Sequence, residues 1–251
     1  DFPKAGDNFD MNDEETFKHS YAYRGLSGGI FQRIMYGTET AGKTPFDKGM
    51  EKLKTIKSNT DFTSIAQERK LTLQPLIDFI QQKVDLKQEV NLNFICTHNS
   101  RRSHLSQIWA QVAASYYSIA NVYCYSGGTE ETALFPKVAE TLTEQGFTIF
   151  KIADGNNPIY AIKYSDTAMP IIGFSKKYNH LFNPSKSFAA IMTCSQADGG
   201  CPFIAGAEKR IPITFEDPKV SDQTPEQTKV YLERSNQIAM EMNYVFSMIK
   251  S

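Results

Sequence analysis

The residues best suited to chemistry form one segment, which reads Phe94-Ile95-Cys96-Thr97-His98-Asn99-Ser100-Arg101-Arg102-Ser103. A cysteine is followed six positions later by arginine and then by serine, between a short apolar run and a helical pattern. A loop that leads into a helix start directs several backbone N–H groups into one concavity, where the positive end of the helix dipole adds to them. The segment therefore predicts a cradle for a tetrahedral oxyanion.

The polar residues of this loop have distinct expected tasks. Cys96 is the candidate nucleophile, because the field of the loop lowers its pKa and favours the thiolate. Arg102 closes the cradle with a two-pronged contact to two anion oxygens. Ser103 donates its hydroxyl to the thiolate, and Asn99 holds the loop through its amide. The other predicted oxyanion-binding positions are Thr97, His98, Ser100 and Arg101.

Two further cysteines, Cys194 and Cys201, are seven positions apart after a predicted core strand. Two thiols at that separation meet only if the backbone between them refolds, and Gly199 and Gly200 lower the cost of refolding. The pair is a redox pair, a pair of buried spectators or, with Cys96 and His98, a zinc site. The paired spacing of structural zinc sites is absent, so no metal is expected. The fourth cysteine, Cys124, is expected in the core.

A general acid must protonate the leaving oxygen, and Asp217, which precedes Pro218, is the candidate. A neutral carboxyl is needed, so burial or a nearby anion must raise its pKa. Glu216 is the local alternative, and both could be plain turn residues.

The elements that would position these residues alternate between strand and helix. Apolar runs predict strands over 92–95, 122–125, 188–193 and 210–215, and helical spacing predicts helices over 65–86, from Ser103, after Pro136 and after Thr224. Pro75 is expected to kink or split the first helix. This order predicts an α/β fold, a three-layer sandwich with a four-stranded parallel sheet. Residues 147–184 are expected to form an inserted hairpin or flap, with Lys176 and Lys177 as a solvated surface pair.

The loop resembles the signature loop of low-molecular-weight protein tyrosine phosphatases and of thioredoxin-coupled arsenate reductases on the same fold. Residues 126–130 are similar to that family's segment after its second strand, and Asp217 resembles its Asp-Pro acid. The likeness covers about residues 90–250 and implies a phosphatase-like fold. The chain departs from it at His98, often glycine in those families, and at Arg101, often cysteine in such reductases.

Residues 192–202 resemble the redox segment of the reductases. The resemblance implies that Cys96 attacks arsenate, that Cys194 attacks Cys96 and releases arsenite, and that Cys201 attacks Cys194. An external thiol reductant such as thioredoxin would then reduce the Cys194–Cys201 disulfide, with no bound cofactor. The predicted function is therefore arsenate reduction. One alternative is hydrolysis of phosphotyrosine or another phosphate monoester through Cys96, Arg102 and Asp217, and another is a non-catalytic oxyanion-binding or redox-sensing module.

Length and charge limit the remaining possibilities. The 251 residues are 41% hydrophobic and 22% charged, as in globular proteins. A net charge of -1 gives no electrostatic reason to bind nucleic acid or an anionic membrane. No apolar run reaches the ~20 residues of a membrane span and no signal-peptide pattern begins the chain, so a cytoplasmic location is expected. Three regions are predicted: residues 1–49, an extension of unknown role or a leader; 50–89, a helical N-terminal region; and 90–251, the phosphatase or reductase-like domain.

Overall fold

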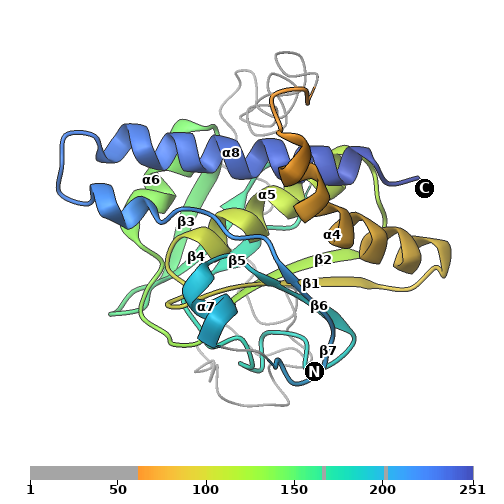
Figure 1. The fold of residues 1–251 in the computed structure, drawn as a ribbon. Helices are drawn as coiled ribbons and strands as arrows, with labels where there is room; N and C mark the ends of the chain where they lie inside the picture. The colour runs from red at the N-terminus through yellow and green to blue at the C-terminus, as the bar shows by residue number, and fades with distance from the viewer. Residues whose placement is uncertain (1–61, 166–167, 201–202, 251) are drawn as a thin grey trace, which may run out of the picture.

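The computed structural model describes residues 62–165, 168–200 and 203–250. The elements used below are α4 (Gln67–Asp85), β1 (Val90–Cys96), α5 (Arg102–Tyr116), β2 (Val122–Gly128), α6 (Pro136–Glu144), β3 (Thr148–Ala153), β4 (Ile159–Lys163), β5 (Ile171–Gly173), β6 (Phe188–Met192), α7 (Ser195–Gly200), β7 (Ala207–Pro212), the 3-10 helix η2 (Pro218–Ser221) and α8 (Gln227–Ser247) (Figure 1). The predicted extension over 1–49, the first part of the predicted region 50–89 and Cys201 lie outside the described residues.

The central sheet has four parallel strands in the order β2-β1-β6-β7. The two middle strands, β1 and β6, are buried along their whole length, as expected where both faces of a parallel sheet are covered. The predicted α/β class with a four-stranded parallel sheet is confirmed. The last strand begins and ends earlier than predicted, but its hydrogen bonding continues past its end, because Phe215 N–H donates to Thr193 O at 3.1 Å.

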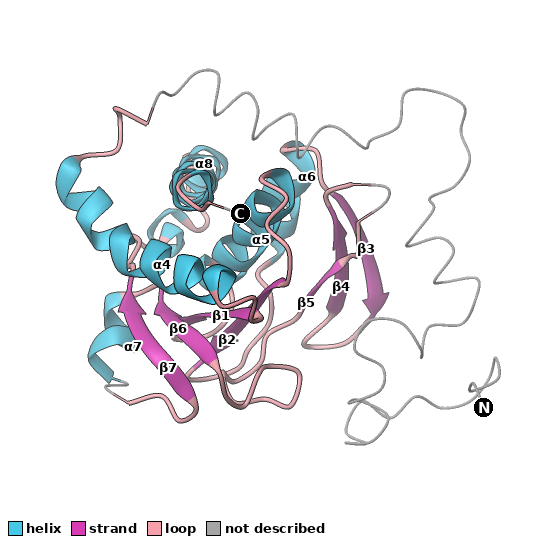
Figure 2. Ribbon diagram, turned by 90° about the vertical axis from the view of Figure 1, so that its right-hand side faces the viewer, coloured by secondary structure: helices cyan, strands magenta, loops and turns pink. Residues whose placement is uncertain are grey.

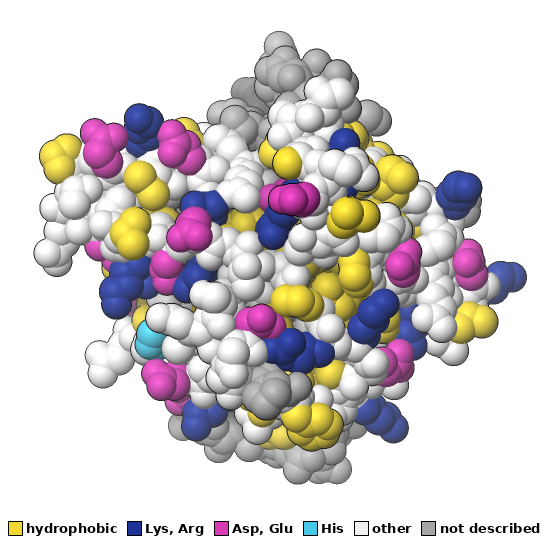
Figure 3. All heavy atoms as spheres, viewed as in Figure 1, with side chains coloured by type: hydrophobic (Ala, Val, Ile, Leu, Met, Phe, Trp, Pro, Cys, Tyr) yellow, Lys and Arg dark blue, Asp and Glu magenta, His cyan; other side chains and the backbone are white. Residues whose placement is uncertain are grey.

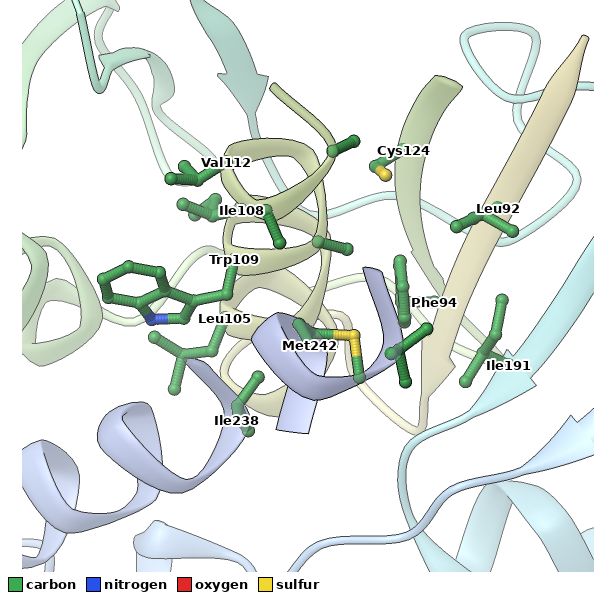
Figure 4. Close-up of a cluster of buried hydrophobic side chains, with 14 of the residues drawn as sticks. Leu92, Phe94, Leu105, Ile108, Trp109, Val112, Cys124, Ile191, Ile238 and Met242 are labelled. Atoms are coloured by element: carbon green, nitrogen blue, oxygen red, sulfur yellow. The ribbon is translucent and has the colours of Figure 1, made fainter. Parts of the chain in front are cut away.

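The layers on the two faces of the sheet are unequal. Helices α4, α5 and α8 cover one face, whereas the short α7 lies on the other (Figure 2). Side chains alternate between the faces along β1, so Leu92 and Phe94 enter the larger core and Ile95 enters the smaller one. Cys96, at the end of the strand, also contacts the smaller core. In the larger core Phe94 lies among residues of α5 and α8 such as Leu105 (Figure 4).

Helix α4 is continuous through Pro75, so the prediction that this proline splits the helix is wrong. Proline removes the N–H that would bond to the carbonyl of Leu71, four residues earlier. Leu71 is 63% exposed, which leaves that carbonyl on the solvent side of the helix. The opposite side carries buried apolar residues, so packing holds the helix together across the missing bond.

The inserted region contains three antiparallel strands, β3, β4 and β5, beside α6 (Figure 2). The Asn157 side chain bonds both backbone groups of Ser175, donating to its carbonyl at 2.7 Å and accepting from its N–H at 3.0 Å. After β5 the chain runs along the end of β2, where Gly128 N–H donates to Lys176 O at 2.8 Å and Tyr178 N–H donates to Gly128 O at 2.8 Å. These hydrogen bonds anchor the insertion to the carboxyl end of β2, beside the loop that follows Cys96.

The described part of the chain contains no candidate membrane span. None of its helices combines the length and apolar character that crossing a bilayer requires. Acidic and basic side chains are interspersed over the face seen in Figure 3. On this face no broad patch of a single charge is present to attract an anion.

Candidate active site

The loop after Cys96 joins the end of β1 to the start of α5. Four of its carbonyl oxygens accept hydrogen bonds from groups outside the loop: Cys96 O from Thr129 N–H (3.1 Å), Thr97 O from Glu130 N–H (2.8 Å), His98 O from the Ser175 hydroxyl (2.9 Å) and Ser100 O from Phe135 N–H (3.0 Å). Within the described residues, the backbone N–H groups of 97–102 donate to no other group. Free N–H groups at a helix start are an anion-binding arrangement.

Asn99 holds the loop from inside. Its backbone has a φ of 44°, a left-handed conformation that asparagine tolerates better than most residues. Its Nδ2 donates to Ser103 Oγ at 2.8 Å, and Ser103 Oγ lies 3.2 Å from Cys96 Sγ. The serine hydroxyl and the cysteine sulfur are thus in contact.

Arg102 is buried, and its guanidinium faces the candidate acid. Nη1 donates to Phe215 O at 2.9 Å and Nη2 lies 2.5 Å from Asp217 Oδ2. Asp217 Oδ1 accepts the Lys219 N–H at 3.1 Å, which caps η2. Glu216, the alternative acid, is exposed. The structure therefore brings Arg102 and Asp217 together beside the loop.

The side chain of Arg101 does not face the same way as that of Arg102. Its Nε donates to the Tyr231 hydroxyl at 2.6 Å, its Nη2 pairs with Asp222 Oδ2 at 2.5 Å, and the guanidinium lies 4.0 Å from the centre of the Phe135 ring. Burial opposes ionisation of Asp222, but hydrogen bonds from Tyr231 and Gln227 and the charge of Arg101 lower its pKa overall. The guanidinium of Arg101 thus joins the loop to α8 and η2.

Three other loop residues reach different neighbours. His98 Nε2 lies 3.4 Å from Glu130 Oε2, and both side chains are largely exposed. The Ser100 hydroxyl donates to Ala133 O at 2.7 Å. Thr97 Oγ1 lies 3.5 Å from Cys194 Sγ and 3.4 Å from Gln196 Oε1.

Cys194 is completely buried at the start of α7, in the same apolar cluster as Cys96. Its Sγ accepts the Ala197 N–H at 3.3 Å. Because β6 pairs directly with β1, Cys194, two residues past the end of β6, meets the loop after β1 at the carboxyl edge of the sheet. The structure thus brings Cys194 to the loop that follows Cys96, while Cys201 lies outside the described residues.

The fourth cysteine and the pocket it lines are separate from this loop. A pocket of about 510 Å³ lies between α5, β2 and the insertion, with Gln107, Cys124, Tyr164 and Ile171 among its walls. None of the predicted site residues lines it. Burial raises the pKa of the Cys124 thiol, which keeps it protonated. Among the described residues, no three His, Cys, Asp or Glu side chains gather as metal ligands would.

The prediction that Lys176 is a solvated surface residue is wrong. Its side chain has no exposed surface, whereas Lys177 is exposed. The Lys176 N–H donates to Asn99 Oδ1 at 2.9 Å, so this lysine contacts the side chain that holds the loop. Two adjacent lysines carry no sequence signal that one is buried, because the enclosing surface comes from the insertion and from β2. His104, hydrogen-bonded to Ser126 at 3.2 Å behind the loop, was likewise not identified from the sequence.

The chain was compared with known proteins. No family model and no curated protein matches it. Solved structures that it resembles include a mutant of YwlE from Bacillus subtilis (11% identity, 63% of this chain and 97% of the other, TM-score 0.42) and a low-molecular-weight phosphotyrosine phosphatase from Vibrio cholerae (12%, 63% and 94%, 0.41). A thioredoxin-dependent arsenate reductase from Corynebacterium glutamicum also resembles it (16%, 88% and 88%, 0.36).

Proposed function

We propose that this protein reduces arsenate to arsenite. The observation that carries the proposal is the second thiol beside the cradle, because Cys194 Sγ is 3.5 Å from the hydroxyl of Thr97, the residue next to Cys96. Hydrolysis of a phosphate ester needs one nucleophile and has no use for a second thiol there. Arsenate reduction needs an electron donor, and thiols supply electrons by forming a disulfide.

The first proposed step is attack on arsenic. Arsenate binds to the N–H groups of the loop and accepts hydrogen bonds from Nη1 and Nη2 of Arg102. Without arsenate, these two nitrogens contact Phe215 O and Asp217. Cys96 thiolate forms an S–As bond, an As–O bond breaks, and the leaving oxygen departs as water after protonation. Asp217, released from Arg102 by the anion, is the candidate proton donor. Arsenic remains As(V) in this step.

The second proposed step transfers the electrons. Cys194 thiolate attacks Cys96 Sγ, so that an S–S bond forms, the S–As bond breaks and its electron pair stays on arsenic as As(III). The Ala197 N–H, 3.3 Å from Cys194 Sγ, is placed to stabilise negative charge on that sulfur. Cys201 then attacks Cys194 Sγ and frees Cys96 as a thiolate. A dithiol reductant of the thioredoxin kind reduces the resulting Cys194–Cys201 disulfide.

Hydrolysis of phosphate monoesters is the second candidate function. It is favoured by the pairing of Asp217 with Arg102 at 2.5 Å, which brings a carboxyl group, the candidate general acid, beside the cradle. This reaction would use Cys96, Arg102 and Asp217 and would not need Cys194 or Cys201.

The test follows NADPH oxidation with arsenate, thioredoxin and thioredoxin reductase, beside hydrolysis of an aryl phosphate by the same samples. We expect the wild type to oxidise NADPH only with arsenate, and Cys194→Ser and Cys201→Ser to lose that turnover. Cys124→Ala is the matched control and should retain it, because Cys124 lies away from the loop. Aryl phosphate hydrolysis without arsenate turnover, unchanged in both serine variants, would refute the reductase and support the phosphatase.

A further inference from the structure

Lys176 is a buried lysine that has no counter-ion among the residues that the structure describes. Its Nζ lies 3.4 Å from Ser126 Oγ and 3.3 Å from Phe174 O, over the rings of Phe174 (4.5 Å) and Phe182 (5.3 Å). Among the described residues no carboxylate pairs with it. A buried ammonium is costly unless an opposite charge compensates it. Burial accordingly lowers the pKa of Lys176 to about 7.

The backbone N–H and the side-chain amine of Lys176 are both connected to the cradle. Its N–H donates to Asn99 Oδ1, and the other end of the same amide holds Ser103 Oγ beside Cys96 Sγ. Its ammonium contacts Ser126 Oγ, which is hydrogen-bonded to His104 in the first turn of α5. The ammonium therefore lies behind the helix start whose N–H groups face the cradle.

The other titratable groups around Lys176 do not neutralise it. Burial and then the charge of Lys176 hold the pKa of His104 well below its ordinary value, so this imidazole is neutral. Burial and Lys176 also lower the pKa of His180, against the opposing effect of Glu131. The negative charge missing from this region is one that a bound oxyanion would bring.

We propose that Lys176 is an internal counter-charge for the cradle, taking up a proton when a tetrahedral dianion binds to the loop of residues 96–102 and releasing it when the anion leaves. This inference rests on the oxyanion-binding part of the proposed function and not on the thiol relay. Linkage is reciprocal: a bound anion stabilises the ammonium, and the ammonium strengthens anion binding. Lys176 is thus a positioning residue that acts through Asn99 and Ser126, and it favours doubly charged anions.

The direct test is a pH titration of the lysine Cε carbons by NMR on the 13C-lysine-labelled wild type, without and with saturating sulfate. Sulfate is a tetrahedral dianion that does not titrate in this range. We expect one lysine to titrate near pH 7 without sulfate, with its midpoint raised by about one pH unit when sulfate is bound. Absence of its signal from Lys176→Met assigns it. A midpoint that sulfate does not move, or an ordinary lysine midpoint in both samples, would overturn the inference.

Calorimetry provides an independent measurement. At about pH 8, sulfate binding in buffers of different ionisation enthalpy should show proton uptake by the wild type and by Lys177→Met, but less by Lys176→Met. Near pH 6, Lys176→Met should bind sulfate about tenfold more weakly than the wild type. If that variant does not fold, the NMR titration of the wild type still decides. Sulfate that does not bind at all refutes the cradle and with it this inference, whereas loss of arsenate turnover with intact, proton-linked sulfate binding counts only against the thiol relay.

Discussion

The loop proposed to bind the oxyanion (residues 96–103, the oxyanion loop) and the segment proposed to carry the redox thiols (residues 194–200, the redox segment) each contribute a thiol, but the molecule encloses them differently. Gly128 packs so closely against the loop that an added Cβ would lie 2.7 Å from Thr97 O and 2.8 Å from Asn99 N. An added Cβ on Gly199 or Gly200 meets nothing within 4 Å. The loop is enclosed on its outer side, whereas the end of the redox segment has free space beside it. A loop that binds an anion needs an enclosed, fixed backbone, whereas a segment whose two thiols must meet needs space to change its backbone conformation.

The largest expected effect comes from Gly128→Ala, which adds a methyl group where Gly128 packs against the loop. The added methyl must displace loop backbone, so we expect sulfate binding to fall below detection and the free energy of unfolding to drop by about 1–3 kcal/mol. Calorimetry and urea denaturation measure the two quantities. Gly199→Ala is the matched control in open space. It should bind sulfate as the wild type does and gain up to about 1 kcal/mol of stability, because alanine suits a helix better than glycine. Normal sulfate binding by Gly128→Ala would show that the oxyanion loop is no more tightly enclosed than the redox segment.

The second prediction compares the ion pairs that hold each segment. Arg101→Leu leaves the partly buried Asp222 without its cation, and we expect a loss of about 1–3 kcal/mol in the free energy of unfolding. Arg210→Leu removes the more exposed pair between Arg210 and Asp198 of α7, at 2.5 Å, and should cost about 1 kcal/mol or less. Urea denaturation of both variants gives the ranking. Equal losses would indicate that the two segments are held with similar strength.

The third prediction concerns pH. Because burial lowers the pKa of Lys176 to about 7, the unfolded chain binds this proton between about pH 7 and the ordinary lysine value while the folded chain does not. Stability must therefore rise with pH in that window, by up to about 1.4 kcal/mol per pH unit from this group. Lys176→Met should lack this part of the slope, and Lys177→Met should keep it. Parallel slopes for wild type and Lys176→Met in urea denaturation would disprove the assignment.

The sequence predicted the parts of the site that lie close together in the chain. Cys96, Asn99, Arg102 and Ser103 are within eight consecutive positions, and strand-loop-helix geometry alone determines how they meet. The parallel sheet was also predictable, because long apolar runs alternate with amphipathic helices. Local patterns were sufficient wherever the partners are neighbours in sequence.

The longer-range features could not be read in the same way. That Cys194 would reach Thr97 depends on β6 pairing with β1, and nothing within either strand specifies its neighbour. Burial of Lys176 depends on Phe174, Phe182 and Ser126 enclosing it from separate elements. Which of two adjacent arginines faces Asp217 depends on where η2 and α8 pack. These features arise from tertiary contacts, so they appear only once the elements are assembled.

The smallest expected effect concerns the redox segment, which has free space beside Gly199 and Gly200. Replacing both Gly199 and Gly200 by alanine creates no clash, but it restricts the backbone that Cys194 and Cys201 need in order to meet. We expect arsenate turnover to fall about fivefold, since stiffening two residues costs roughly 1 kcal/mol in the refolded form, with sulfate affinity unchanged. Steady-state NADPH oxidation and calorimetry on the same samples separate the two quantities. A parallel loss of sulfate affinity would show that the redox segment also shapes the cradle, and unchanged turnover would show that its backbone need not refold for the thiols to meet.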